Sequence, residues 1–280
     1  MRNYTVMKKF MILRNSDKDR RGTFSKKVGD YLTEKGAECF YSIDGMDIDE
    51  DVECVIVLGG DGTMLRAAKK VVDRGIPLMG INLGTLGYLA EVDKREVYSA
   101  LDHLLEDEYI LEERMMLRGT VYHNDEVIAS DVALNDVVIV RQGRLRVVSF
   151  MNYVNGEYLN SYNADGIILS TATGSTGYSL SCGGPIVSPE SKAILLTPIS
   201  PHTLITRSII LTSSDQITVM IGQGHEPGAA EASVSFDGDA YITVHSGDRI
   251  VVEKSDKSTK IIKLSGVSFL EILRQKMAGS

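Results

Sequence analysis

The chain has 280 residues, of which 43% are hydrophobic and 24% are charged, and its formal net charge at pH 7 is −8. This length fits one large domain or two ordinary ones, and the composition is that of a soluble globular protein. The acidic balance argues against general nucleic-acid binding, and no apolar run approaches the roughly 20 residues that a membrane-spanning helix needs. The three cysteines, Cys39, Cys54 and Cys182, have no paired spacing, so we expect a reducing, cytoplasmic location.

The first part of the chain alternates strand and helix patterns. We expect strands over 8–14, 37–42, 52–58 and 77–82, and helices over 23–35, 63–74 and 98–106. Gly36 and Gly75 stand where a glycine commonly ends a helix. Strands that alternate with helices predict a parallel sheet with helices on its faces, and ligands bind at the carboxyl ends of such strands.

The turn after the third strand carries the most informative motif. An apolar run, CVIVL, ends in Gly59, Gly60, Asp61, Gly62 and Thr63, and a helical pattern follows at once. Free N–H groups at a helix start suit phosphate, and glycines let a ligand approach the backbone closely. A carboxylate there would repel phosphate unless it meets a metal, a hydroxyl proton or a sugar. A turn acid or helix cap is the structural alternative, but a cap does not need glycine on both sides.

The second part of the chain is rich in strand patterns. We expect strands over 117–123, 127–141, 147–154, 167–170, 209–211, 217–221, 241–245 and 249–253, with a hairpin turn at Asn155-Gly156, a mobile loop at 228–232 and a helix over 269–277. The predicted fold is an N-terminal α/β domain with a parallel sheet (1–114), against which segment 258–280 packs, and a C-terminal β-rich, sandwich-like domain (115–257). We expect the active site in the cleft between the two domains.

Polar clusters interrupt the strands of the second part. Asn135-Asp136 lies inside an apolar run, Asn163 and Asp165 precede Gly166, and 171–185 is rich in hydroxyls and glycines. Hydroxyls and open N–H groups suit a phosphate, ribose or amide ligand. Taken alone, the 171–185 segment is better explained as a Ser/Thr/Gly loop that caps a helix.

The clusters in this order resemble the NAD kinase family. The resemblance rests on 59–63 (GGDGT), 82–89 (NLGTLGYL), 135–136 (ND), 165–166 (DG), 173–181 (TGSTGYSLS), 200–204 (SPHTL) with Arg207, and 237–238 (DG), and it spans about residues 8 to 272. It implies transfer of the γ-phosphoryl group of ATP to the 2′-hydroxyl of the adenosine ribose of NAD, with Mg²⁺ on the nucleotide. It also implies a homodimer or homotetramer that needs neither nucleic acid nor a membrane. Whether polyphosphate can replace ATP as the donor stays open.

The resemblance also implies roles for particular residues. Asp61 would be the catalytic residue, accepting a hydrogen bond from the 2′-hydroxyl and then its proton. The residues that would contact NAD or ATP are Gly59, Gly60, Gly62, Thr63, Arg66, Tyr88, Asn135, Asp136, Arg146, Asn163, Asp165, Thr173, Thr176, Gly177, Tyr178, Ser181 and Ser200. No side chain is predicted to be a metal ligand. Arg66 fits a solvated helix position equally well, and Tyr88 fits a packed core tyrosine.

Three positions depart from the pattern of the family. Gly177 stands where the family usually has Ala, Asp239 stands near a position that is often Gln, and residues 14–17 lack a glycine-rich opening. Two other functions stay open at this point. A lipid or sphingoid kinase would share the GGDGT turn but not the hydroxyl-rich loop, and a non-catalytic dinucleotide sensor would bind NADP without releasing ADP from ATP and NAD.

Overall fold

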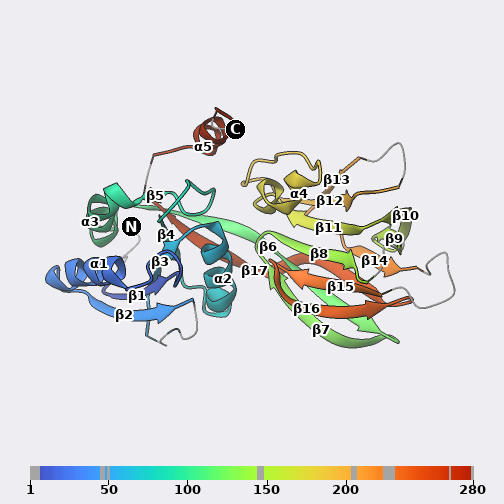
Figure 1. Cartoon of the computed structure of the whole chain (residues 1–280), viewed down its shortest axis with the longest axis horizontal. Helices are drawn as coiled ribbons and strands as arrows, with labels where there is room; N and C mark the ends of the chain where they lie inside the picture. The colour runs from blue at the N-terminus through green and yellow to red at the C-terminus, as the bar shows by residue number, and fades with distance from the viewer. Residues whose placement is uncertain are drawn as a thin grey trace. The chain divides into compact units, whose positions relative to one another are not determined.

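The computed structural model describes residues 7–44, 48, 51–143, 148–202, 207–222, 231–264 and 266–278. The chain forms two compact units, Met1–Arg114 with Lys257–Ser280, and Met115–Asp256 (Figure 1). Two long strands, β6 (Ile110–His123) and β17 (Arg249–Lys263), contain the boundaries between the units. No helix within the described ranges is long and apolar enough to cross a membrane.

The first unit is built on a parallel sheet in the order β2-β1-β3-β4. Its strands are β1 (Lys9–Arg14), β2 (Glu38–Ile43), β3 (Cys54–Gly59) and β4 (Leu78–Asn82). Short β5 (Val92–Asp93) pairs with β4, and β17 joins β4 in parallel through Ile261 and Leu78. Every residue of β3 is buried, as its continuous apolar sequence predicts for a central parallel strand. The predicted α/β architecture of this part is confirmed.

Helices cover both faces of this sheet. Helices α1 (Thr23–Glu34) and α3 (Val97–Leu105) contact each other, and their apolar residues share one core cluster with Phe10 and Ile12 of β1. Helix α2 (Asp61–Val71) packs on β3 and β4. A Cβ at Gly80 of β4 would lie 3.0 Å from the sulfur of Met64, so the glycine lets α2 approach its strand closely. Two 3₁₀ turns, η1 (Val72–Arg74) and η2 (Lys94–Glu96), and helix α5 (Phe269–Ala278) complete the unit.

The predicted helix over 63–74 differs from the structure at both ends. Helix α2 begins at Asp61, and after Val71 the chain tightens into η1 before it leaves at Gly75. Gly75 has a left-handed backbone with φ of 62°, as predicted for the glycine that ends this segment. The early start means that Asp61 lies in the first turn of the helix and not in the loop before it.

Adjacent strands β1 and β3 send their connections in opposite directions, since β1 leads to β2 on one side and β3 leads to β4 on the other. A reversal of this kind opens a crevice at the carboxyl ends of the two strands, where ligands bind in open α/β sheets. The loops after the two strands are tied together there. The N–H group of Asn15 donates to the carbonyl of Leu58 at 3.0 Å, and Asn15 Nδ2 donates to Thr63 Oγ1 at 3.3 Å.

The second unit has two sets of antiparallel strands. One sheet has the order β13-β12-β11-β8-β15-β16, and its strands are β13 (Ile209–Thr212), β12 (Ala193–Ile199), β11 (Gly166–Thr171), β8 (Asp136–Arg141), β15 (Glu231–Phe236) and β16 (Asp239–His245). The other set pairs β10 (Glu157–Ala164), β9 (Val148–Val154), β14 (Ile217–Ile221) and β17, and it includes the β6–β7 hairpin, with β7 at Glu126–Ala133. Phe150, Ile167, Val219 and Phe236 meet in one core cluster from both sets. The β-rich prediction is confirmed.

Three local predictions differ in how well they match the structure. The single strand expected over 127–141 is wrong, because β7 and β8 are separated at Leu134–Asn135, whose N–H groups bind Asp237. Of the loop expected at 228–232, residues 228–230 lie outside the described ranges, and the last two begin β15. The Asn155-Gly156 turn is confirmed, with φ of 51° and 82° between β9 and β10.

Candidate active site

The turn between β3 and α2 brings the glycine-rich motif to the carboxyl edge of the first sheet. Gly60, the residue before the helix, is extended and has no side chain to cap it. The N–H groups that the Asp61 carboxylate accepts belong to residues 88–90 and not to the start of α2. A Cβ at Gly59 would lie 2.4 Å from Thr63 Oγ1, so only glycine fits there. The first turn of a helix leaves N–H groups without helical partners, and these groups attract an anion.

The carboxylate of Asp61 is held by three successive backbone N–H groups. Its Oδ2 atom accepts from Tyr88 at 2.8 Å, and Oδ1 accepts from Leu89 at 3.0 Å and from Ala90 at 3.2 Å. The neighbouring Gly87 has no room for a side chain, because its Cβ would lie 2.0 Å from Oδ1 of Asp61. The glycine-containing segment 82–89 therefore orients Asp61 of the segment 59–63.

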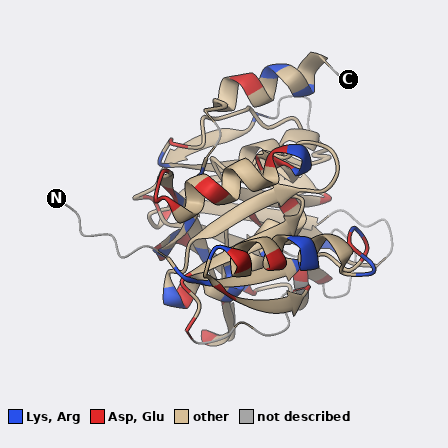
Figure 2. Ribbon diagram, turned by 90° about the vertical axis from the view of Figure 1, so that its left-hand side faces the viewer, with Lys and Arg blue, Asp and Glu red and all other residues tan. Residues whose placement is uncertain are grey.

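Tyr88 packs against the last helix of the first unit. Its ring lies 5.9 Å from that of Phe269, and the ammonium of Lys276 lies 4.8 Å from the ring centre. Figure 2 shows both basic and acidic residues along α5. Partial burial, with a smaller contribution from the charge of Asp61, raises the pKa of Tyr88. The ring is thus a packed side chain of this unit, half-buried beside the acid.

Arg66 lies one helical turn after Asp61. Its Nε atom is buried, and it has no hydrogen-bond partner among the described residues. The pKa of the Asp44 carboxyl is lowered, mainly by its hydrogen bond with the Ser16 hydroxyl. The positive charges of Arg66 and Arg14 lower this pKa further. Arg66 is therefore close enough to Asp44, which follows β2, for its charge to act on that carboxyl.

Asp237 organises the Asn135-Asp136 step of the second unit. Its carboxylate accepts the N–H groups of Leu134 and Asn135 at 2.7 Å each and that of Asp136 at 3.1 Å. Its own N–H donates to the carbonyl of Asp136 at 3.0 Å, and its φ is 55°. Burial, and then the charge of Asp237, raises the pKa of Asp136 to about 7. Asn135 Oδ1 is buried and has no partner in the described part of the chain, so an unused acceptor lies at this step.

The hydroxyl-rich loop packs directly against that step. Thr171 Oγ1 donates to the carbonyl of Leu134 at 2.6 Å and accepts the N–H of Gly174 at 3.0 Å. A Cβ at Gly174 would lie 2.2 Å from the carbonyl oxygen of Asn135, and one at Gly177 would lie 3.3 Å from Asn135 Nδ2. The structure therefore brings Gly177 and the Asn135-Asp136 step together.

Most hydroxyls of the loop are used inside the protein. Ser175 Oγ donates to the carbonyl of Ala172 at 2.7 Å, Thr176 Oγ1 donates to that of Thr173 at 3.2 Å, and Ser179 Oγ lies 3.0 Å from Thr197 Oγ1. Figure 1 shows the short helix α4 (Tyr178–Ser181), which these bonds help to fix after the turn η3 (Gly174–Thr176). Tyr178 and Ser181 are exposed, so they are the members of this segment best placed to meet a ligand.

The remaining predicted residues have varied environments. Asp165 accepts a bond from Arg141 Nε at 2.7 Å, so a cation that sequence reasoning missed already pairs with it. The carbonyl of Asn163 accepts the N–H of His202 at 2.8 Å, and Ser200 is exposed with φ of 45°. Arg146 lies outside the described residues.

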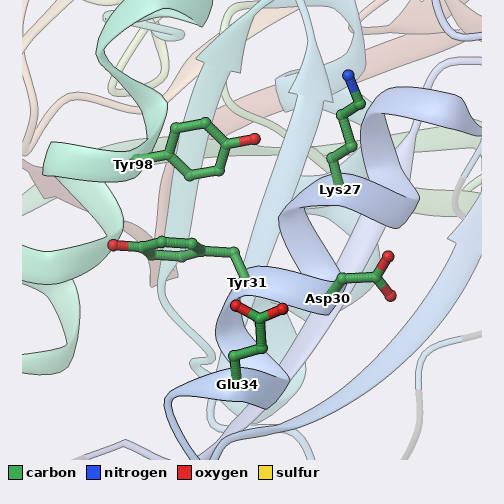
Figure 3. A pocket seen from close by; sticks show the side chains of 5 residues that line it. All are labelled: Lys27, Asp30, Tyr31, Glu34 and Tyr98. Carbon is green, nitrogen blue, oxygen red and sulfur yellow. The ribbon is translucent and has the colours of Figure 1, made fainter.

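Two further surface features lie away from these residues. One is an open depression of about 430 Å³, and Figure 3 shows the side chains that line it, Lys27, Asp30, Tyr31, Glu34 and Tyr98. The rings of Tyr31 and Tyr98 lie 4.8 Å apart there and are tilted by 51° to each other. Within the described ranges, the group whose ligand atoms lie close enough to share a metal ion is His103, Glu106 and Glu108, all exposed near the end of α3. Neither feature contains a predicted site residue.

Comparisons with known proteins match both units. Residues 13–109 match the family model described as the ATP-NAD kinase N-terminal domain, and residues 134–264 match the ATP-NAD kinase C-terminal domain. The chain is 44% identical to the NAD kinase of Lachnospira eligens, over 97% of this chain and 100% of that protein. It is 46% identical to the NAD kinase of Agathobacter rectalis, over 97% of this chain and 99% of that protein.

The chain belongs to the NAD kinase family. Two solved structures share its fold. One is yeast NADH kinase complexed with NADH, with a TM-score of 0.84, 23% identity and coverage of 98% of this chain and 88% of that one. The other is an NAD kinase from Archaeoglobus fulgidus in complex with ATP, with a TM-score of 0.76, 22% identity and coverage of 96% and 97%.

As a member of the NAD kinase family, the chain is an ATP-dependent kinase, so the enzyme interpretation holds over the lipid kinase and the non-catalytic sensor. Sequence reasoning missed Gly87, Asp237 and Arg141 as residues that position the site. Gly87 and Asp237 belong to segments on which the family resemblance rests. The glycine at 87 and the Asp-Gly step at 237–238 were therefore the features that could have marked them as site residues. Nothing in the sequence pairs Arg141 with Asp165, because that contact joins the end of β8 to the residue before β11.

Proposed function

We propose that Asp61 faces the 2′-hydroxyl of the adenosine ribose of NAD while ATP donates its γ-phosphoryl group. The arrangement of the Asp61 carboxylate carries this proposal. A carboxylate offers about four acceptor positions. Two on Oδ1 and one on Oδ2 are taken by the N–H groups of Leu89, Ala90 and Tyr88, which leaves one on Oδ2 for a hydroxyl donor.

The transfer itself needs orientation and charge neutralisation more than covalent chemistry. The ribose oxygen forms a bond to the γ-phosphorus, the bond between that phosphorus and the bridging oxygen of ADP breaks, and the hydroxyl proton passes to Asp61. The rigid backbone cradle holds the acid in place for this step. The unpartnered Oδ1 of Asn135 supports a contact of the second unit with the adenosine of a nucleotide, because a buried acceptor without a donor is costly.

We propose that Mg²⁺ enters with ATP, bound to the phosphates of that substrate, and is not held by Asp61. Mg²⁺ prefers a near-ideal octahedron of oxygen ligands and usually keeps several waters. Three N–H donors on the Asp61 carboxylate leave little of it for a metal. We further propose that the protein is cytoplasmic and forms a homodimer or homotetramer. Light scattering on the purified protein tests the oligomeric state directly.

The substitution Asp61→Asn tests the catalytic assignment. The purified protein is given NAD and ATP, and NADP is measured with an NADP-specific dehydrogenase. We expect the variant to lose NADP formation while calorimetry still detects NAD binding. Turnover close to that of the wild type would contradict the assignment. Thermal unfolding of the variant serves as the control, because an amide group in place of one oxygen also weakens the N–H contacts of the cradle.

A further inference from the structure

Lys18 lies in the loop after β1, at the carboxyl edge of the sheet, where the connections of β1 and β3 run to opposite sides. The loop is held in one conformation by Asn15, whose Oδ1 atom accepts the N–H groups of Asp17 and Lys18 at 3.1 and 3.0 Å. The same asparagine is bonded to the β3–α2 segment through Leu58 and Thr63. The base of the Lys18 side chain is therefore fixed relative to the glycine turn.

The ammonium group of Lys18 reaches over two glycines of the candidate site. A Cβ at Gly60 would lie 2.9 Å from Lys18 Nζ, and a Cβ at Gly84 would lie 3.3 Å from it. Gly60 directly precedes Asp61, and Gly84 belongs to the segment that continues into the Asp61 cradle. One exposed cation thus lies against both glycine-containing segments of the first unit.

This cation has no acidic partner in the described part of the chain. Across the residues that the structure describes, no carboxylate lies within ion-pair distance of Lys18 Nζ, although 38 acidic residues stand against 30 Lys and Arg in the chain. An ammonium group is a point charge that binds phosphate oxygens well. The bare backbone of Gly60 and Gly84 lets this ammonium group lie directly against both segments, because neither residue has a side chain in its place.

We infer that Lys18 binds the phosphate chain of the donor nucleotide above the glycine turn. This inference rests on the proposed function, because it assigns a residue to the phosphate donor of that reaction. It also explains how a polyanion approaches a turn that carries the negative charge of Asp61. Lys18 supplies a positive charge beside Gly60, the residue before Asp61, next to the partial positive charge at the N-terminus of α2.

The experiment compares Lys18→Ala and Lys18→Arg with the control Lys70→Ala. Lys70 is also exposed, but it lies in the last turn of α2, at the end opposite Asp61. Calorimetry measures the affinity of each protein for inorganic tripolyphosphate, and steady-state kinetics measure the KM values for ATP and NAD. We expect Lys18→Ala to weaken tripolyphosphate binding and to raise the KM for ATP by at least about tenfold, as for the loss of one charge-assisted hydrogen bond. Lys18→Arg should keep most of the affinity, and the KM for NAD should stay within about twofold in all variants.

Equal tripolyphosphate affinity in Lys18→Ala and Lys70→Ala would overturn the inference, as would a wild-type protein that does not bind this anion at all. A wild-type protein that binds tripolyphosphate through Lys18 but makes no NADP would instead contradict the proposed function. The two failures are separable, because the binding measurement does not need turnover.

Discussion

A side chain at Gly87 would place its Cβ 2.0 Å from the Oδ1 atom of Asp61. The contact joins two segments that are separate in the sequence, the turn after β3 and the loop after β4. The acid thus depends on a residue that has no functional group of its own. The N–H groups of the three residues after Gly87 hold the same carboxylate.

The substitution Gly87→Ala should therefore displace the Asp61 carboxylate. We expect kcat to fall by about a hundredfold, since a shift of roughly 1 Å in a reacting group has an effect of that size. Steady-state formation of NADP measures it. Gly266→Ala is the matched control, because a Cβ at Gly266 meets no atom within 4 Å. A Gly87→Ala enzyme with the kcat of the control would show that Asp61 does not need this cradle.

Asp237 should be needed for the Asn135-Asp136 step. In Asp237→Asn, the amide nitrogen cannot accept the N–H groups that the carboxylate binds, while Asn still tolerates the positive φ. We expect unfolding free energy to fall by about 1–3 kcal/mol and the KM for NAD to rise, with the KM for ATP unchanged. Urea unfolding and steady-state kinetics measure these effects. Asp125→Asn, at an exposed hairpin residue with φ of 63°, is the control, and equal effects in both variants would argue against a positioning role.

The pKa of Asp136 predicts a pH dependence of stability. Its folded-state pKa is raised from 3.8 to about 7, so the folded protein holds this proton more tightly than the unfolded chain does between these values. Its contribution to stability is therefore present at low pH and is lost as pH rises through about 7. Relative to Asp136→Asn, the unfolding free energy of the wild type should fall by about 2–3 kcal/mol between pH 5 and pH 8. Urea titrations of both proteins at these pH values measure the difference, and parallel pH profiles would refute it.

Periodicity and turn residues were sufficient to predict the general architecture. The apolar run that forms β3 and the Asn-Gly hairpin between β9 and β10 are local signals, so their structures follow from neighbouring residues. Strand β12 (Ala193–Ile199) was not predicted, and it contains Pro198, a residue that is uncommon within sheets. The structure tolerates this proline because β13 pairs only with residues 193–196 of β12.

The residues that position the site could not be predicted in the same way. Asp61 and Asp237 both belong to Asp-Gly steps, and each binds three successive N–H groups of a distant segment. A single sequence gives the acid and the glycine but not the partner, because the partner is chosen by the sheet topology. The ion pair of Arg141 with Asp165 likewise depends on the register between β8 and the residues that precede β11.

The division of the chain has a consequence for folding during synthesis. The first unit needs residues from both parts of the sequence, because β17 completes its sheet by pairing Ile261 with Leu78. The second unit is continuous and lies wholly between these parts. On the ribosome, the second unit can therefore finish folding before the first. Strand β4 can pair with β17 only after that strand, one of the last to be synthesised, has emerged.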